Sequence, residues 1–427
     1  MPLASSDTSM HLEPETNGPE RGGHKVIERV RRCRTDTLDA LLVIIPVPIL
    51  TVLTVILLSC LPASAHGQTK PILIQGLPSC PVCTIERYQL STITDASLPG
   101  GAIVEGGEVH VNSDLTFLLI TGPRWDEVYV ADRSGNLVRR VGRTGRGPGE
   151  YIGPTYVVEV PSEYWIVDVV LHRITRLSKV SLEVVGTMTL PPGELIGAPV
   201  PFADGSFVLR ADIRTRDRIG FALHHGSVQG ILRSFAPADT ILPGRVAPPL
   251  VLAKTRDGSG VWAAHVNQYR IEKWDTAGRL MSIHERNADW FSVRTDGRRP
   301  PGQRYAAILG IHEDSSGRLW VHAAIRTTAA DGIRFDPSRS ESVVEILEPA
   351  EGRVLATERF PDVAAASTMG GFFQMVPRST LGGSLEIEIW GFRLNEKQVR
   401  PARLVLPSSR TEPFGGKAAS ATITRRP

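Results

Sequence analysis

A short β-rich unit that recurs along the chain is the feature that most constrains the fold. From about residue 96 onward, an apolar run leads through a turn to a run that alternates apolar and polar residues, as in 270–274. Alternation with a period of two is typical of a half-buried antiparallel strand. An aromatic residue marks each unit, and the spacing of 36 to 58 residues is close to the length of four strands. The marked positions are Tyr129, Trp165, Phe207, Trp262, Trp320 and Phe373.

Units of this kind predict a ring of small sheets. One four-stranded sheet cannot shield both of its faces, but packing against two neighbours buries them, and a closed ring leaves no unpaired outer face. We therefore predict an all-β fold, a six-bladed β-propeller over residues 96–405. The alternative is a pair of β-sandwiches, which would not need a recurring unit of blade length. We expect the last blade to be completed by a strand from the N-terminal side, either Thr84 to Ile93 or Ala102 to His110.

The N-terminal 65 residues have the pattern of an export signal or of a membrane anchor. Residues 40–61 are almost wholly apolar and carry no charge, and they end in an A-x-A pattern at residues 63–65. A basic cluster precedes them, made of Lys25, Arg29, Arg31, Arg32 and Arg34. Three outcomes remain open: cleavage after Ala65, retention as a single transmembrane helix in contact with the bilayer through residues 40–61, or lipidation at Cys60. Each predicts a propeller outside the cytoplasm, in the periplasm, the extracellular space or anchored to the membrane.

Only two cysteines follow that segment, Cys80 and Cys83, in a predicted linker over residues 66–95. In an oxidising compartment the expected state is a local disulfide. Free or partner-linked thiols are one alternative, and a redox motif is another, although no βαβ pattern surrounds the pair. A zinc site would need a second pair of ligands. At the other end of the chain, residues 406–427 are rich in Ser, Thr, Gly and Arg and are predicted to be disordered.

The run from Gly142 to Tyr151 resembles a known signature. It reads G-R-T-G-R-G-P-G-E-Y, and it resembles the turn of bacterial extracytoplasmic six-bladed β-propeller proteins, which are similar to the NHL-repeat group. The segment around Asp168 and Arg173 also resembles the NHL pattern. The resemblance implies the same fold, export and a disulfide between Cys80 and Cys83, and it implies no assigned activity. A structural turn and a backbone nest for an anion are two readings of the glycines.

Propeller ligands usually lie on the axis, where strand ends from several blades converge. The residues predicted to face it are Asp132, Asp168, Arg210, His265 and His322. Carboxylates and imidazoles are suitable ligands for Ca or Zn, and the lactonase-like and amidating-lyase-like propellers that this fold resembles hold metals there. The competing interpretation is that the aspartates bond the backbone of the following turn. The pair His224-His225 lies beside a turn glycine and is predicted to be solvated.

Composition limits the function. The net charge is only +3 and the basic residues are scattered, so no nucleic-acid partner is expected. The sequence has no G-x-S-x-G elbow and no H-E-x-x-H motif. We therefore predict a binding or scaffold propeller without a cofactor, whose partner is an envelope protein, a peptide or a glycan. The alternatives are a metal-dependent hydrolase or lyase that uses the axial residues, and a redox accessory protein that uses Cys80 and Cys83.

Overall fold

The computed structural model describes most of the chain after residue 68. The ranges are 69–94, 108–112, 117–121, 126–195, 197–237, 249–292, 304–328, 335–361, 365–367, 373–379 and 385–396. All of them belong to the second of two units, Gln68–Pro427. Within these ranges no helix is long and apolar enough to cross a bilayer. The predicted membrane segment 40–61, Cys60 and the tail 406–427 lie outside the described residues.

The described residues form six sheets of four or five strands, numbered 1 to 6 here. Sheet 1 contains β3 (Glu108–Val111), β4 (Phe117–Thr121), β5 (Glu127–Ala131) and β6 (Leu137–Arg140). Sheet 2 contains β9 (Pro154–Glu159), β10 (Glu163–Asp168), β11 (Arg173–Ser178) and β12 (Val184–Thr189). Sheet 3 contains β13 (Glu194–Leu195), β14 (Val200–Pro201), β15 (Phe207–Asp212), β16 (Phe221–Ser227) and β17 (Gly230–Pro237). A two-stranded parallel sheet of β7 (Arg143–Thr144) and β8 (Glu150–Tyr151) lies between sheets 1 and 2 in the chain.

The other three sheets include the N-terminal strands. Sheet 4 contains β18 (Leu250–Lys254), β19 (Gly260–His265), β20 (Arg270–Asp275), β21 (Leu280–Arg286) and, at its outer edge, β1 (Ile72–Ile74). Sheet 5 contains β22 (Arg304–Glu313), β23 (Leu319–Thr328), β24 (Phe335–Glu348) and β25 (Arg353–Phe360). Sheet 6 contains β26 (Ala365–Ser367), β27 (Phe373–Ser379), β28 (Leu385–Glu396) and, outermost, β2 (Cys83–Thr94).

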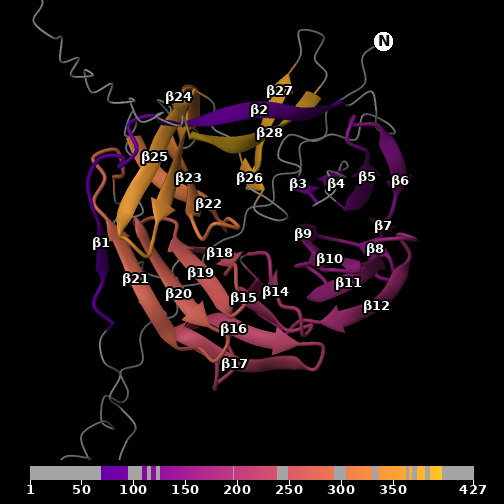
Figure 1. Cartoon of the computed structure of the whole chain (residues 1–427). Helices are drawn as coiled ribbons and strands as arrows, with labels where there is room; N and C mark the ends of the chain where they lie inside the picture. The colour runs from indigo at the N-terminus through magenta and orange to yellow at the C-terminus, as the bar shows by residue number, and fades with distance from the viewer. Residues whose placement is uncertain are drawn as a thin grey trace, which may run out of the picture. The chain divides into compact units, whose positions relative to one another are not determined.

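The sheets form a closed ring. The strand nearest the centre of each sheet contacts its counterpart in the next one, in the order β3, β9, β14, β18, β22, β26 and back to β3. Figure 1 shows these strands gathered around the middle, with the outer strands at the rim. The described part of the chain is therefore an all-β propeller, as predicted.

The alternating sequence of the strands explains the ring. In β10, Tyr164 and Ile166 are buried with residues of sheet 1, and the intervening Trp165 and Val167 are buried with residues of sheet 3. Both faces of the strand are thus covered by neighbours, because successive side chains point to opposite faces. One apolar cluster fills each of the six junctions between neighbouring sheets.

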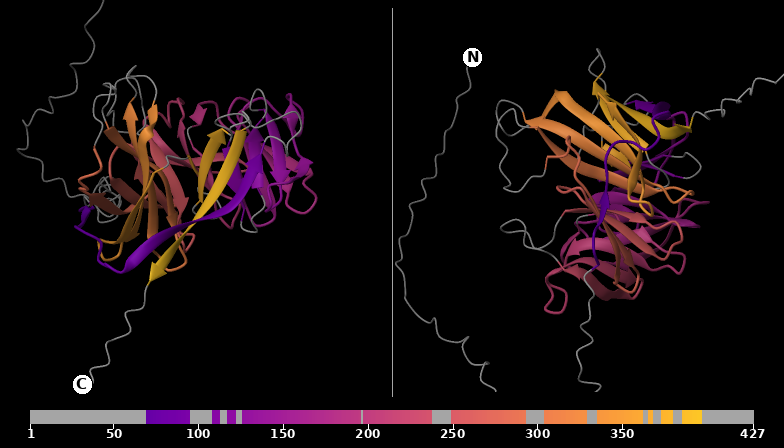
Figure 2. Two further views of the ribbon diagram at one scale, coloured as in Figure 1. Left: turned by 90° about the horizontal axis from the view of Figure 1, so that it is seen from above. Right: turned by 60° about the vertical axis from the view of Figure 1, so that its left-hand side comes forward.

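An N-terminal strand completes the last sheet. β2 pairs antiparallel with β28, from Cys83 opposite Glu396 to Thr94 opposite Glu386. Figure 2 shows the two strands side by side across the rim. The first of the two predicted closing strands, Thr84 to Ile93, is therefore confirmed. The predicted linker over residues 66–95 contains both β1 and β2, so it contributes two strands to the ring.

The structure corrects the alignment of the first unit. Five of the six aromatic positions lie on the second strand of their sheet, but Tyr129 lies on β5, which is the third strand of sheet 1. The cause is the turn after β5, from Asp132 to Asn136, which resembles in sequence the end of a second strand. Its true counterpart is the turn from Asp275 to Arg279, where the same backbone bonds connect the third and fourth strands of sheet 4.

Candidate functional site

Asp168 ends the second strand of sheet 2, and its carboxylate is fully buried. Oδ2 accepts the backbone N–H groups of Ile152 (2.8 Å) and Gly153 (3.2 Å). Oδ1 accepts those of Val170 (3.0 Å) and Leu171 (2.8 Å). Four backbone donors account for the lone pairs of this carboxylate, so it holds two chain segments in place.

His265 ends the second strand of sheet 4, at the same face of the ring as Asp168. Its Nε2 lies 3.5 Å from Oε1 of Glu272, an ion-pair distance. Glu272 also accepts bonds from Arg270 Nε (2.8 Å) and Trp274 Nε1 (3.0 Å). Burial alone would raise the pKa of Glu272, but the bonds from His265 and Arg270 outweigh it and lower the pKa to about 2. Glu272 is the charged centre of this cluster, and the sequence analysis did not single it out.

Arg210 and His322 lie within their strands rather than at the ends. Arg210 is buried on β15, paired in register with Leu223. His322 is fully buried on β23, and its Nε2 lies 3.2 Å from Ser342 Oγ on β24. Burial, reinforced by the charge of Arg326, lowers the pKa of His322 to about 3. This imidazole is therefore neutral at physiological pH.

Asp132 lies at the opposite face of the ring, because it follows a third strand and neighbouring strands are antiparallel. It accepts the N–H groups of Ser134 (2.8 Å) and Asn136 (2.9 Å). The Asn136 N–H is the main reason that the pKa of Asp132 is lowered. The five predicted axial residues therefore do not all lie at one face of the ring, because Asp132 is separated from Asp168 and His265. Across the described ranges, no three His, Cys, Asp or Glu side chains lie close enough to hold a metal ion.

The signature loop from Gly142 to Tyr151 binds its own carboxylate. Glu150 Oε2 accepts the N–H of Gly147 (2.8 Å), and Oε1 accepts bonds from Arg143 Nε (3.1 Å) and Nη2 (2.8 Å). These contacts, the Gly147 N–H first, hold the pKa of Glu150 below its usual value. The backbone donor that an external anion would use is thus occupied by an internal one.

Two further contacts fasten this loop to sheet 2. Arg173 donates from Nη1 to the carbonyl of Arg146 (2.9 Å) and from Nη2 to that of Glu150 (2.5 Å). Gly142 lies against the ring of Tyr151, and a Cβ at this glycine would come within 2.2 Å of that ring. The glycine is required by this close approach rather than by an unusual φ. The loop therefore acts as a polar brace between sheets 1 and 2.

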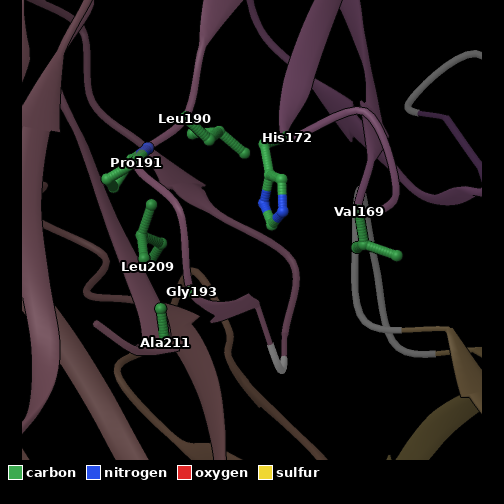
Figure 3. A pocket seen from close by; sticks show the side chains of 7 residues that line it. All are labelled: Val169, His172, Leu190, Pro191, Gly193, Leu209 and Ala211. Carbon is green, nitrogen blue, oxygen red and sulfur yellow. The ribbon is translucent and has the colours of Figure 1, made fainter. Parts of the chain in front are cut away.

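A small pocket lies between sheets 2 and 3, at the face where Asp168 lies. Its lining consists of Val169, His172, Leu190, Pro191, Gly193, Leu209 and Ala211 (Figure 3). The volume of about 10 Å³ leaves room for roughly one water molecule. His172 has a φ of 47°, and its carbonyl accepts the N–H of Leu190 at 2.7 Å. This pocket is too small for a sugar or a peptide side chain.

A buried ion pair joins sheets 4 and 5. Arg286 Nε and Nη2 donate to Glu345 Oε2 and Oε1, both at 3.0 Å. Tyr269 donates its hydroxyl proton to Glu345 at 2.6 Å, and Thr357 donates to the same carboxylate at 3.0 Å. Burial, together with the charge of Glu345, raises the pKa of Tyr269 well above its usual value. Sequence reasoning missed this network, since its members lie far apart in the chain.

Two histidine predictions and the cysteine prediction have clear outcomes. His224 is fully buried on β16, with Nδ1 2.8 Å from Ser234 Oγ and Nε2 3.1 Å from the Ala211 carbonyl, so the prediction that it is solvated is wrong. Its neighbour His225 lies on the same strand and is only partly buried. Cys80 and Cys83 form a disulfide, as predicted, at the start of β2.

Comparisons with known proteins show the fold and no family. No family model matches the chain, and no curated protein matches its sequence. A solved structure of a protein described as exported, from Bacteroides fragilis, has a TM-score of 0.51 at 12% identity, covering 75% of this chain and 99% of that one. A member of the DUF4221 family from Bacteroides vulgatus has a TM-score of 0.52 at 9% identity, covering 73% and 99%. At these identities the similarity is to the fold alone.

Proposed function

We propose that this chain is an extracytoplasmic six-bladed β-propeller that binds or scaffolds a partner and carries out no reaction of its own. The count of six blades is supported by the six sheets of the described residues and by the cyclic contacts of their innermost strands. Export is supported by the apolar run 40–61 and by the similarity in fold to a protein described as exported. The sequence of the signature loop supports the assignment of this chain to the NHL-like extracytoplasmic propellers.

The observation on which this proposal rests is that the carboxylate of Asp168 is bonded to the protein's own backbone. An aspartate at the end of a second strand is where a propeller enzyme would place a ligand or a base, and here four backbone donors occupy it. Carboxylates in catalytic or metal sites need a free lone pair for the substrate or ion. We propose an envelope protein, a peptide or a glycan as the partner, and no resident cofactor.

Localisation is tested with the full chain fused at its C-terminus to alkaline phosphatase, which is active only outside the cytoplasm. We expect high activity in cells and low activity when the apolar run 40–61 is deleted. If the phosphatase fusion were inactive and a reporter that works only in the cytoplasm, fused at the same position, were highly active, export would be refuted.

The metal-dependent alternative is tested by elemental analysis of the purified full chain. We expect calcium and zinc to be substoichiometric. One equivalent of either metal, lost in a His265→Ala variant that retains its thermal unfolding midpoint, would support a hydrolase or lyase instead. The redox alternative is tested by thiol counting with and without reductant, where two accessible thiols from Cys80 and Cys83 in the non-reduced protein would argue against the disulfide.

A further inference from the structure

One segment, residues 72–83, lies along the outer rim of sheets 4 and 5 and is called the strap here. β1 pairs in parallel with β21, from Ile72 opposite His284 to Ile74 opposite Arg286. The strap then crosses to sheet 5, where Ser79 N–H donates to the Val354 carbonyl at 2.8 Å and Cys80 N–H to Leu355 at 3.2 Å. Figure 1 shows it in indigo at the left-hand rim. The strap is thus a fixed part of the propeller surface.

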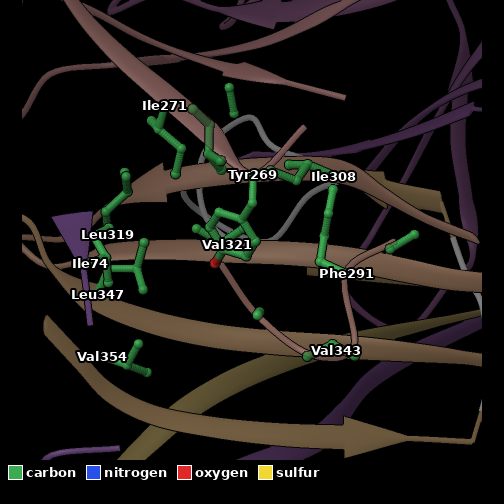
Figure 4. Close-up of a cluster of buried hydrophobic side chains, with 14 of the residues drawn as sticks. Ile74, Tyr269, Ile271, Phe291, Ile308, Leu319, Val321, Val343, Leu347 and Val354 are labelled. Atoms are coloured by element: carbon green, nitrogen blue, oxygen red, sulfur yellow. The ribbon is translucent and has the colours of Figure 1, made fainter. Parts of the chain in front are cut away.

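The strap carries four apolar side chains that are exposed to solvent. Ile72 is 39% exposed, Leu73 57%, Leu77 88% and Val82 39%. Ile74 points inward, where it is 2% exposed and joins the apolar cluster between sheets 4 and 5 (Figure 4), and the disulfide cysteines Cys80 and Cys83 pack against the cluster between sheets 5 and 6. Single exposed aliphatic residues are ordinary on protein surfaces, but here four of them follow one another within eleven consecutive residues of one rim segment.

The strap is also the point where the rest of the N-terminal chain joins the propeller. The predicted membrane segment ends at Leu61, and β1 begins at Ile72, eleven residues later. A chain of eleven residues reaches at most roughly 40 Å when it is fully extended. If the segment stays in the bilayer, the first residue of the strap can lie no farther than roughly 40 Å along the chain from the end of that segment.

We propose that the strap rests on the bilayer that holds residues 40–61, with Ile72, Leu73, Leu77 and Val82 inserted among the lipid headgroups. This inference rests on the proposed extracytoplasmic propeller in its anchored form. Aliphatic side chains gain by leaving water at a bilayer interface. Four of them bind weakly by themselves, but the short tether keeps them at a high effective concentration next to the membrane. The contact would fix which rim of the ring faces the membrane.

The test is lipid quenching of a tryptophan placed on the strap. The full chain carrying Leu77→Trp is reconstituted into phosphatidylcholine vesicles with or without brominated acyl chains. The matched control is Val180→Trp, because Val180 is 97% exposed on sheet 2, across the ring from sheet 5. We expect the fluorescence added by the substitution at position 77, after subtraction of the unmodified chain, to fall about twofold in brominated vesicles. The signal added at position 180 is expected to be unchanged.

The outcomes separate the two proposals. Equal quenching at positions 77 and 180, or none at either, in protein that floats with the vesicles would overturn the strap contact and leave the anchored propeller standing. Protein that does not float with the vesicles would refute the anchored form, and the strap contact with it. A Leu73→Asp, Leu77→Asp double variant should still float with the vesicles, because residues 40–61 are intact. A tryptophan introduced by Val82→Trp should be quenched by brominated lipid in the otherwise unmodified chain. The same tryptophan should not be quenched in the double variant.

Discussion

Two junctions of the ring hold neighbouring sheets together in different ways. Between sheets 4 and 5, a cluster of 17 buried apolar residues surrounds the Arg286–Glu345 pair, whose side chains are 7% and 1% exposed. Between sheets 1 and 2, the cluster has 7 buried apolar residues among the side chains that the structure describes, and the signature loop adds polar contacts at the rim. There the Arg143–Glu150 pair is 71% and 24% exposed.

The difference shows where a charge is required and where it is incidental. A buried ionised side chain needs a countercharge, because removing an unpaired ion from water costs several kcal/mol. A charge at the rim keeps its water whether or not its partner is present. The junction of sheets 4 and 5 should therefore depend on side-chain pairing, and that of sheets 1 and 2 on backbone bonds and close packing.

The largest effect is expected from Glu345→Gln. The substitution keeps the shape of the side chain and leaves Arg286 buried without a countercharge, so the free energy of unfolding should fall by about 3 to 5 kcal/mol. Urea denaturation at pH 7 measures it. The control is Glu183→Gln, which removes an exposed pair with Arg139 and should change stability by less than about 1 kcal/mol. Similar losses in both variants would show that the buried pair is not special.

Asp168→Ala should come next, and it tests the backbone bonds of the other junction. The variant leaves four buried or half-buried N–H groups without an acceptor, two of them directly after the signature loop, so we expect a loss of about 2 to 4 kcal/mol. Asp132→Ala is the matched control, because that carboxylate bonds an exposed turn and its loss should cost about 1 kcal/mol or less. If Asp132→Ala lowered the free energy of unfolding as much as Asp168→Ala, the burial of the Asp168 bonds would not explain the loss of stability.

A smaller effect is expected from Gly142→Ala, which tests the close packing of the signature loop. The added Cβ would come within 2.2 Å of the Tyr151 ring, and displacing this buried ring should cost about 1 to 3 kcal/mol. Gly186→Ala is a fair comparison, since the nearest atom to its Cβ would be Arg176 Nη1 at 3.7 Å. That variant should be neutral or slightly stabilised, and a thermal melt is sufficient to rank the two.

Much of the ring could be predicted from the sequence, because its cause is local. Alternation with a period of two, the recurrence of the unit and the turn residues are all visible in short windows. The closing strand could be predicted only as one of two candidates, because a closed ring needs a further strand but the pattern of residues 84–93 does not alternate strictly and so does not single that segment out. The error at Tyr129 arose because Asp132 and Asp168 both follow an apolar run and precede a turn, although one ends a third strand and the other a second.

The buried network could not be predicted, because its cause is not local. Glu345 lies between Val344 and Ile346, as an exposed charge on a half-buried strand also would. Its partner Arg286 is 59 residues away in the chain. Whether a charge that faces the next sheet meets a countercharge or water depends on the packing of that sheet. The sequence pattern assigns Asp132 to the wrong face for a related reason: whether a strand is the second or the third of its sheet decides the face at which it ends, and that depends on pairing along the whole sheet.

Acid should lower the stability of both junctions by a similar amount, because each contains a buried histidine. The comparison tests whether the two junctions, which differ in their charged pairs, also differ in their interiors. His110, on β3 of sheet 1, and His284, whose ring meets that of Trp262 at an interplanar angle of 58° at the junction of sheets 4 and 5, are both buried. Burial lowers the pKa of each to about 4. Below pH 6.5 the unfolded chain binds a proton at each position and the folded chain does not, so stability falls as the pH drops from 6.5 toward 4. Each histidine should remove up to about 1.4 kcal/mol per pH unit.

The slope of the free energy of unfolding against pH, measured between pH 6 and 5, gives the number of protons that the unfolded chain binds in excess of the folded chain. His110→Gln and His284→Gln should each reduce the slope by nearly one proton, whatever they do to stability at pH 7. Between pH 7.5 and 8.5 both histidines are neutral in both states, so neither variant should alter the slope there. An unchanged acid slope in one variant alone would place that histidine in contact with water and would extend the contrast between the two junctions to their interiors.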